Sequence, residues 1–139
     1  MNSHGAVLLG MQTPRFLTLP PSADEGRAGQ EALELAADAG VQAFEWQETA
    51  VVGSLAERPD GRCAAATVAL NVPRQNGKDE ILVIVELAWL FIYEAVRLIT
   101  HTAHRFDTCL EHFLRLRTII EDTPDLSRKV RKISDTNGK

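Results

Sequence analysis

The sequence predicts an α/β domain with a mostly parallel, incomplete sheet, and three observations lead to this prediction. Two short apolar runs, at residues 62–72 and 97–102, suit strands. A long apolar run at residues 78–96 lies between them and suits a helix. A strand, a helix and a second strand in this order imply a right-handed crossover with parallel strands. With 139 residues, 45% hydrophobic and 24% charged, the chain has room for one small globular domain.

The N-terminal part is predicted to contain an irregular arm followed by two helices. Residues 1–29 are rich in Pro, Ser and Gly, and prolines block regular helix, so an extended or disordered arm is expected. Residues 30–39 place apolar side chains at helical spacing, and Gly40 suits the position just beyond a helix end. Residues 44–55 suit a second helix. Residues 30–139 are predicted to form the domain.

The apolar runs predict how deeply each central element is buried. Residues 62–72 are continuously small or apolar, which is typical of a strand covered on both faces. Their alanines also suit a helix, but the run ends in Asn-Val-Pro, which favours extended backbone. The helix at residues 78–96 leaves almost no polar face, so burial on all sides is expected, and Glu86 alone interrupts its central run.

The C-terminal part is predicted to begin as an amphipathic helix and to end in an unfinished fold. Residues 106–121 carry apolar side chains at helical spacing. Near the last residues, Asn137-Gly138 is a strong hairpin signal, but no return strand follows it. The sheet is therefore expected to be incomplete, and the uncovered apolar faces predict marginal stability or aggregation.

Charge and cysteine content indicate the kind of cellular compartment and the kind of partner to expect. The net charge is −4. From Arg97 onward 9 Lys and Arg stand against 6 Asp and Glu, which is compatible with nearby nucleic acid but too small an excess to argue for it. Cys63 and Cys109 are far apart, which suits a reducing cytosol and argues against disulfides or a zinc motif. The apolar run at residues 81–93 falls short of the roughly 20 residues that span a bilayer. A soluble, cytoplasmic protein is expected.

The loop between the predicted strand and the long helix carries the chemistry. Its sequence is Pro73-Arg74-Gln75-Asn76-Gly77-Lys78-Asp79. A strand, a tight loop with Gly-Lys and a helix form a setting in which backbone N–H groups, a helix N-terminus and an ammonium group bind phosphates. The match to G-x-x-x-x-G-K-[ST] is partial, because Val72 replaces the first Gly and Asp79 replaces Ser/Thr. The loop is also compatible with a plain polar turn.

The segment from Pro73 to Lys78 resembles the deviant Walker A motif of the terminase large subunit of tailed phages, the ATP-driven motor that packages DNA into procapsids. Three more stretches resemble that family in the same order: Phe44-Glu45-Trp46-Gln47, Thr102-Ala103-His104-Arg105-Phe106-Asp107-Thr108, and residues 123–133. The similarity covers most of the chain, from about Thr13 onward. It implies a partial P-loop NTPase three-layer sandwich that binds ATP with Mg²⁺.

The resemblance also implies roles for single residues in the loop. Lys78 would neutralise charge on the β/γ-phosphates, and Arg74 would contact the γ-phosphate and stabilise the charge of the transition state. A surface salt bridge is the alternative for Arg74. Asp79 stands where a hydroxyl normally ligates Mg²⁺, so Asp79 is a candidate Mg²⁺ ligand, and weakened nucleotide binding is expected because an anion there opposes the phosphates.

Two more pairs of residues receive roles in the same way. Trp46 and Gln47 resemble an adenine-recognition element, with helix packing as the alternative, and packing is favoured for Phe44. His104 and Thr108 would contact a DNA phosphate. A metal site of histidines is not expected, because no carboxylate or cysteine shares their spacing.

Several parts of a complete terminase have no counterpart in the sequence. The chain lacks a Walker B strand, a catalytic glutamate and the nuclease domain, so no substantial ATP turnover is expected from it alone. In a full-length protein the partners would be double-stranded phage DNA, the small terminase subunit and the portal, with oligomers only if the protein is complete. The alternatives are a non-catalytic nucleotide- or partner-binding module and a fragment of a helicase-like or kinase-like P-loop NTPase.

Overall fold

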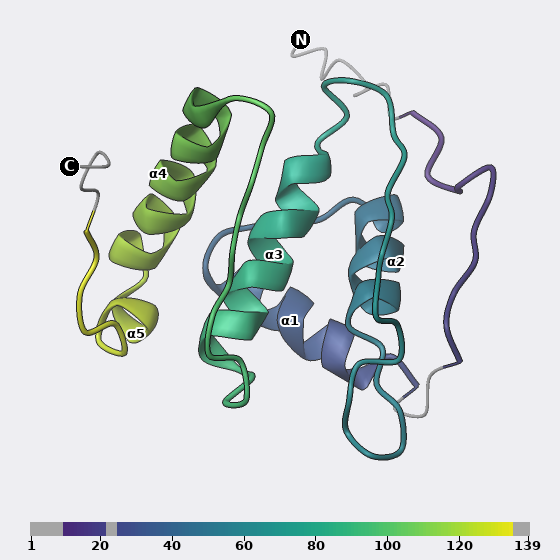
Figure 1. Ribbon diagram of the computed structural model, residues 1–139, viewed down its shortest axis with the longest axis horizontal. Coiled ribbons are helices and arrows are strands. Elements are labelled where there is room, and N and C mark those ends of the chain that lie inside the picture. Colours follow the sequence, from purple (N-terminus) through teal and green to yellow (C-terminus); the bar gives the residue numbers. More distant parts are fainter. Residues whose placement is uncertain (1–9, 22–24, 135–139) are drawn as a thin grey trace, which may run out of the picture.

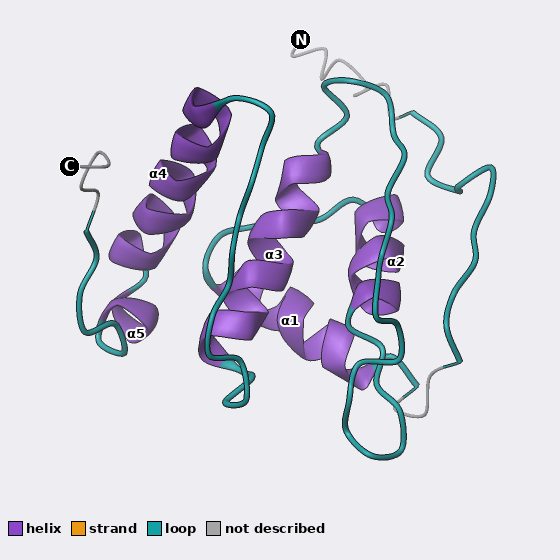
Figure 2. Ribbon diagram, viewed as in Figure 1, coloured by secondary structure: helices purple, strands orange, loops and turns teal. Residues whose placement is uncertain are grey.

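Helices form the whole regular structure of the residues that the computed structural model describes, 10–21 and 25–134 (Figures 1 and 2). The elements in chain order are α1 (Arg27–Asp38), α2 (Glu45–Ser54), α3 (Lys78–Phe91), α4 (Phe106–Asp122) and α5 (Pro124–Ser127). The first three helices pack on one another, α4 contacts α3, and α5 packs against α4. Figure 1 shows that α2, α3 and α4 all begin at the same end of the molecule.

The predicted α/β fold is wrong. Within the described residues, β-pairing is limited to an isolated antiparallel bridge between Glu57 and Cys63, and there is no sheet. The segments at 62–72 and 97–102 run in the same direction, as a crossover requires, but they are not paired with each other (Figure 2). The mostly parallel sheet and the three-layer sandwich are therefore absent from this part of the chain.

The two apolar segments form no sheet because a buried strand needs neighbours that these segments lack. A strand covered on both faces requires neighbouring strands for its backbone groups and a layer on each side for its side chains. Here Val68 is 48% exposed, Leu70 42% and Leu98 82%. The two apolar runs are not helical, but local composition did not supply strands to pair with.

The packing of α1 on α2 depends on small side chains. Ala28, Ala32 and Ala36 are buried and lie four residues apart, so they form one face of α1. At Gly29 an added Cβ would lie 2.4 Å from the backbone Cα of Val52, so the two helices approach as closely as a glycine allows. This close approach brings α2 into the core formed with α3.

Helix α3 is the centre of the core. It was expected to be buried on all sides, and this is confirmed for its middle, from Val83 to Ala88, whereas Lys78, Asp79, Leu82 and Leu90 are exposed. Its buried residues are Ile81, Val83, Ile84, Val85, Glu86, Leu87 and Ala88. The helix ends at Phe91, earlier than the predicted residue 96, because the N–H groups of Ile92 and Tyr93 both turn back to the carbonyl oxygen of Ala88.

The other predicted helices are confirmed with small shifts at their ends. The helix expected at 30–39 is α1, which begins at Arg27, so the last residues of the predicted arm are helical. Gly40 has a φ of 78° and follows the end of α1 as expected. The helices expected at 44–55 and 106–121 are α2 and α4. Residues 10–21 form neither helix nor strand, and the predicted hairpin turn at Asn137-Gly138 lies outside the described residues.

Candidate functional site

The loop that precedes α3 has a backbone shape set by two left-handed residues. Gln75 has a φ of 57° and Gly77 a φ of 74°, and Lys78 is the first residue of the helix. A left-handed conformation is unfavourable for most residues and is readily adopted by glycine. The Gly-Lys pair therefore stands where the chain turns sharply into a helix N-terminus.

The N-terminus of α3 has backbone donors to offer. The helix has no side-chain cap, and the N–H group of Glu80 donates to the carbonyl oxygen of Gly77 at 3.1 Å. In the described part of the chain, the N–H groups of Gly77, Lys78 and Asp79 have no hydrogen-bond acceptor. Unpaired N–H groups and the positive end of the helix dipole together favour an anion at this position.

The charged side chains at the loop point to weak rather than strong anion binding. The ammonium group of Lys78 lies 3.7 Å from a carboxylate oxygen of Asp79, and both side chains are more than half exposed. Asp79 and Glu80 place two negative charges in the first turn of α3, where they satisfy the same positive helix end that a phosphate would use. Arg74 is exposed and forms no salt bridge, so its alternative role in a surface ion pair has no partner within the described residues.

Gln47 fixes the loop to the start of α2. Its side chain is 2% exposed, its Oε1 accepts from the N–H of Phe44 at 2.7 Å, and its Nε2 donates to the carbonyl oxygen of Gly77 at 2.7 Å. The amide therefore caps α2 and joins it to the loop at the same time. Both ends of this amide already have protein partners, so adenine recognition by Gln47 would require these hydrogen bonds to be exchanged.

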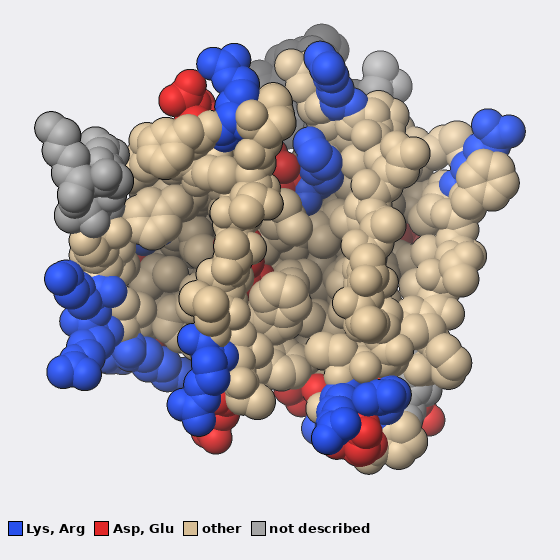
Figure 3. Space-filling model, in the orientation of Figure 1, with Lys and Arg blue, Asp and Glu red and all other residues tan. Residues whose placement is uncertain are grey.

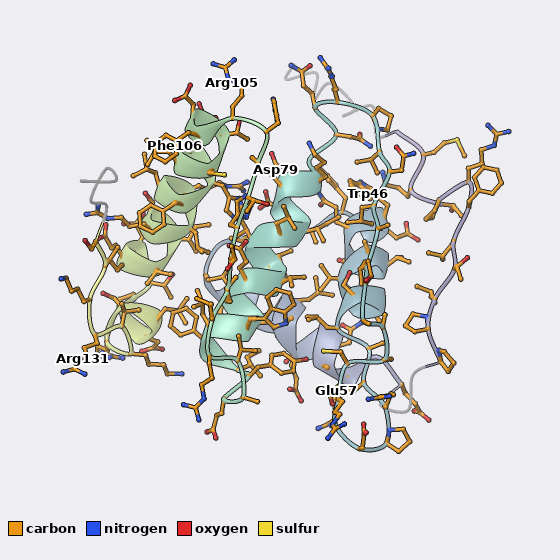
Figure 4. All side chains as sticks on the ribbon, viewed as in Figure 1. Trp46, Glu57, Asp79, Arg105, Phe106 and Arg131 are labelled. Atoms are coloured by element: carbon orange, nitrogen blue, oxygen red, sulfur yellow. The ribbon has the colours of Figure 1, made fainter. Side chains whose placement is uncertain are left out.

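A cavity of about 1180 Å³ lies beside the loop. Its walls come from residues 10–20, from α2 and from the extended segment at 65–77. Trp46 is half-buried and lines the cavity, while Phe44, for which packing was favoured, is 51% exposed and lines the same cavity. Figure 4 shows Trp46 and Asp79 at the same end of the neighbouring helices α2 and α3. The members of the predicted loop on the cavity wall are Pro73, Gln75, Asn76 and Gly77.

The predicted DNA-contacting residues lie before and at the start of α4. His104 and Thr108 are both exposed. Their neighbours Arg105 and Phe106 lie at the end of the molecule where α3 also begins (Figure 4). In Figure 3, the largest group of Lys and Arg side chains lies at the lower left, near the Arg131 labelled in Figure 4, so it lies away from the end of the molecule where Arg105 is found.

A polar cluster that the sequence did not predict is buried between α3, α4 and the segment that joins them. Glu86 accepts from Nδ1 of His101 at 2.8 Å with one carboxylate oxygen and from Nε2 of His112 at 2.9 Å with the other. The two imidazole rings stack with centroids 4.0 Å apart. No carboxylate shares the sequence spacing of the histidines, but the structure brings one to them from α3, 15 and 26 residues earlier in the chain.

The ionisation of Glu86 follows from its surroundings. Burial raises the pKa of this carboxyl group, but the hydrogen bonds and the electrostatic attraction of His112 and His101 outweigh burial, so its pKa lies below the ordinary value. An ionised carboxylate only accepts hydrogen bonds, so both facing ring nitrogens carry protons. A sequence signal for this cluster existed, because a single carboxylate in an apolar helix requires a buried partner.

Comparison with family models, with curated proteins and with solved structures matches this chain to none of them. The likeness to terminases therefore rests on the four sequence stretches alone. No helix in the described part of the chain is both long enough and apolar enough to cross a membrane.

Proposed function

We propose that residues 73–79 bind the phosphate groups of ATP together with Mg²⁺. The segment of the terminase large subunit that they resemble has this role. One observation carries the proposal: Gly77, in the left-handed conformation, leads into an uncapped helix that begins with Lys78. Phosphate binding requires unpaired backbone donors with a lysine beside them, and this turn presents both.

The cavity beside the loop supports a nucleotide rather than inorganic phosphate. A volume of about 1180 Å³ exceeds that of many small-molecule sites, which measure roughly 300–1,000 Å³. Trp46 offers an aromatic ring on the wall of this cavity, against which a base can pack. In this arrangement Trp46 contacts the base directly, and Gln47 contributes chiefly by fixing the carbonyl group of Gly77.

The roles of the charged groups follow from where phosphates would lie. When a nucleotide binds, the ammonium group of Lys78 leaves the carboxylate of Asp79 and neutralises phosphate oxygens instead. Arg74 is free to reach the γ-phosphate. Asp79 contributes to a site for Mg²⁺, and its charge opposes the phosphates when the metal is absent.

The wider function proposed is that of the ATP-binding part of a motor that packages viral DNA, located in the host cytoplasm. Its partners in a full-length protein would be double-stranded DNA, with His104 and Thr108 near a phosphate, together with the small terminase subunit and the portal. Turnover of ATP is not proposed for this chain alone, because the sequence lacks residues that hold an attacking water.

A second candidate is a non-catalytic nucleotide-binding module, and one observation favours it. A phosphoryl-transfer enzyme uses the lysine of such a loop for catalysis, but here the ammonium group of Lys78 is already paired with Asp79. A module of this kind binds ATP and diphosphate nucleotides similarly, whereas a motor subunit is expected to distinguish them through the γ-phosphate.

The experiment is a calorimetric titration of the purified chain with ATP and Mg²⁺, with two matched lysine variants. Lys78→Ala removes the loop ammonium group, and Lys132→Ala removes an exposed lysine far along the chain. We expect wild type and Lys132→Ala to bind, and Lys78→Ala to bind at least about tenfold more weakly, since one charge-assisted contact contributes roughly 1.5–3 kcal/mol. Equal binding by Lys78→Ala, or no binding by folded wild type, refutes the proposal.

A fluorescence titration separates base recognition from phosphate recognition. Trp89→Phe leaves Trp46 as the remaining tryptophan, so the emission reports on the cavity wall. ATP is expected to change this emission, whereas inorganic triphosphate is expected to compete with ATP but to leave the emission nearly unchanged. A lack of competition by triphosphate contradicts phosphate binding at the loop.

A further inference from the structure

The cluster of Glu86, His101 and His112 lies apart from the phosphate loop. Glu86 is eight residues along α3 from Lys78, which at 1.5 Å per residue is a distance of about 12 Å. The cluster brings together three separate pieces of chain: the middle of α3, the extended segment at 97–105, and the second turn of α4. Two of its members are almost fully enclosed, since the side chains of Glu86 and His112 are 9% and 8% exposed.

We propose that Glu86, His101 and His112 bind one divalent transition-metal ion, of the class of Zn²⁺, and that this ion fastens α4 and the extended segment to α3. The proposal does not depend on nucleotide binding, because none of the three residues belongs to the loop or lines the cavity beside it.

The ligand chemistry favours a transition metal over Mg²⁺ or Ca²⁺. Two imidazole nitrogens and one carboxylate oxygen form a donor set that suits Zn²⁺ and its neighbours, whereas Mg²⁺ and Ca²⁺ take oxygen donors almost exclusively. The three potential ligand atoms lie within 4.8 Å of one another. Tetrahedral zinc with bonds of about 2.0–2.1 Å places its ligand atoms roughly 3.3 Å apart, so the most distant donors must move closer together before they share one ion.

The two hydrogen bonds of Glu86 mark the position where the ion would bind. Each lies between a ring nitrogen and a carboxylate oxygen, at 2.8 Å for His101 and 2.9 Å for His112. To bind one ion, both facing ring nitrogens lose their protons; each proton moves to the other nitrogen of its own ring where that nitrogen is unprotonated, and otherwise to solvent. An isolated charge is unfavourable at this buried position. The attraction between the Glu86 carboxylate and a dication is stronger than the two hydrogen bonds that it replaces.

One ring must turn before both nitrogens can bind the same ion. The imidazole planes differ by only 11° and the rings are stacked with centroids 4.0 Å apart, so the lone pairs of the two rings lie in two nearly parallel planes and cannot both point directly at one ion. His112 is held in α4, whereas His101 lies on extended backbone and its side chain is 23% exposed. His101 is therefore the residue that can rotate, and its exposed edge provides the path by which an ion enters.

The consequence of binding is structural. Apart from this cluster, the polar link between α3 and α4 in the described residues is the salt bridge between Glu80 and Arg115, which is exposed on the arginine side. Surface salt bridges of this kind contribute little. An ion bound by residues of α3, of α4 and of the segment between them would link these three parts of the chain at one point. Its binding should raise the temperature at which α4 separates from α3 and unfolds.

The test measures Zn²⁺ binding to the full chain in a background that lacks thiols. Cys109 lies close by, with its Sγ 4.0 Å from the carbonyl oxygen of His101, so both cysteines are first replaced, as Cys63→Ser and Cys109→Ser. Calorimetry then gives the stoichiometry and affinity for Zn²⁺, and Co²⁺ absorption in the visible range reports the coordination number. The melting temperature is measured with Zn²⁺ and with EDTA.

We expect one equivalent of Zn²⁺, a tetrahedral Co²⁺ spectrum and a higher melting temperature with the metal. Glu86→Gln and His112→Gln should each weaken binding at least about tenfold, and His104→Ala, an exposed histidine outside the cluster, should leave it unchanged. His101→Gln, on the extended segment, provides a variant that keeps the buried pair if the other two fail to fold. The proposal is refuted if folded wild type binds no Zn²⁺, or if His104→Ala weakens binding as much as His101→Gln does.

Discussion

Replacement of Gln47 by glutamate tests whether its buried amide fixes the loop before α3. The carboxylate keeps the size of the amide and can still accept from the N–H of Phe44, but it has no donor for the carbonyl oxygen of Gly77, 2.7 Å away. The lost hydrogen bond costs about 0.5–1.5 kcal/mol, and two acceptors facing each other in a site that is 2% exposed add about 1–3 kcal/mol. We expect Gln47→Glu to lower the free energy of unfolding by about 2–4 kcal/mol.

Urea unfolding followed by circular dichroism measures this loss. With an m value of about 2 kcal/mol/M, the midpoint should fall by roughly 1–2 M at pH 7. Gln42→Glu is the control, because Gln42 is exposed, and its midpoint should stay close to that of wild type. Acid should reduce the effect, since a protonated carboxyl group regains a donor for Gly77. An unchanged midpoint for Gln47→Glu at pH 7 would show that the amide does not hold the loop.

Three further predictions concern the loop and the polar cluster. Gly77→Ala should destabilise the protein more than Gly61→Ala, because both glycines have positive φ but the added methyl group meets Gln47 Nε2 at 3.0 Å only at position 77; equal melting temperatures for the two variants would contradict this. Asp79→Ser should tighten ATP binding by removing a negative charge beside the phosphates, and an unchanged calorimetric affinity would contradict that reasoning. The lowered pKa of Glu86 implies that its carboxylate stabilises the fold above about pH 4.5 and that this contribution disappears as the pH falls through the lowered value. In metal-free buffer, the stability difference between wild type and Glu86→Gln should therefore shrink in acid, and a difference that is constant with pH would refute the assignment.

The helices could be predicted from the sequence because their information is local. Apolar spacing located α1 and α4 to within a few residues, and Gly40 marked the end of the first of them. The nearly continuous apolar run from Ile81 onward correctly predicted that the middle of α3 is buried. Periodicity within one segment is sufficient for such predictions, since a helix satisfies its own backbone groups.

The strands could not be predicted in the same way. Residues 62–72 and 97–102 have the composition of strands and form no helix, but a strand also requires a partner that its own sequence does not specify. The same limit applies to the candidate sites. The bond from Gln47 to Gly77 spans 30 residues, and Glu86 meets His112 across 26, so neither pair forms a spacing that a motif could detect.

The two ways in which the helices are attached have different consequences for the solution behaviour of the molecule. Helices α1, α2 and α3 meet through alanine, glycine and branched aliphatic side chains, whereas the link from α3 to α4 includes ion pairs and imidazole–carboxylate hydrogen bonds. Contacts of the first kind change little with ionic strength, and contacts of the second kind weaken with salt or acid. Amide protons of α4 should therefore exchange with deuterium earlier than those of α3, and the interval between the two should widen as salt is added. The chain would then behave as an apolar three-helix unit with a C-terminal helix whose docking depends on the ionic conditions around it.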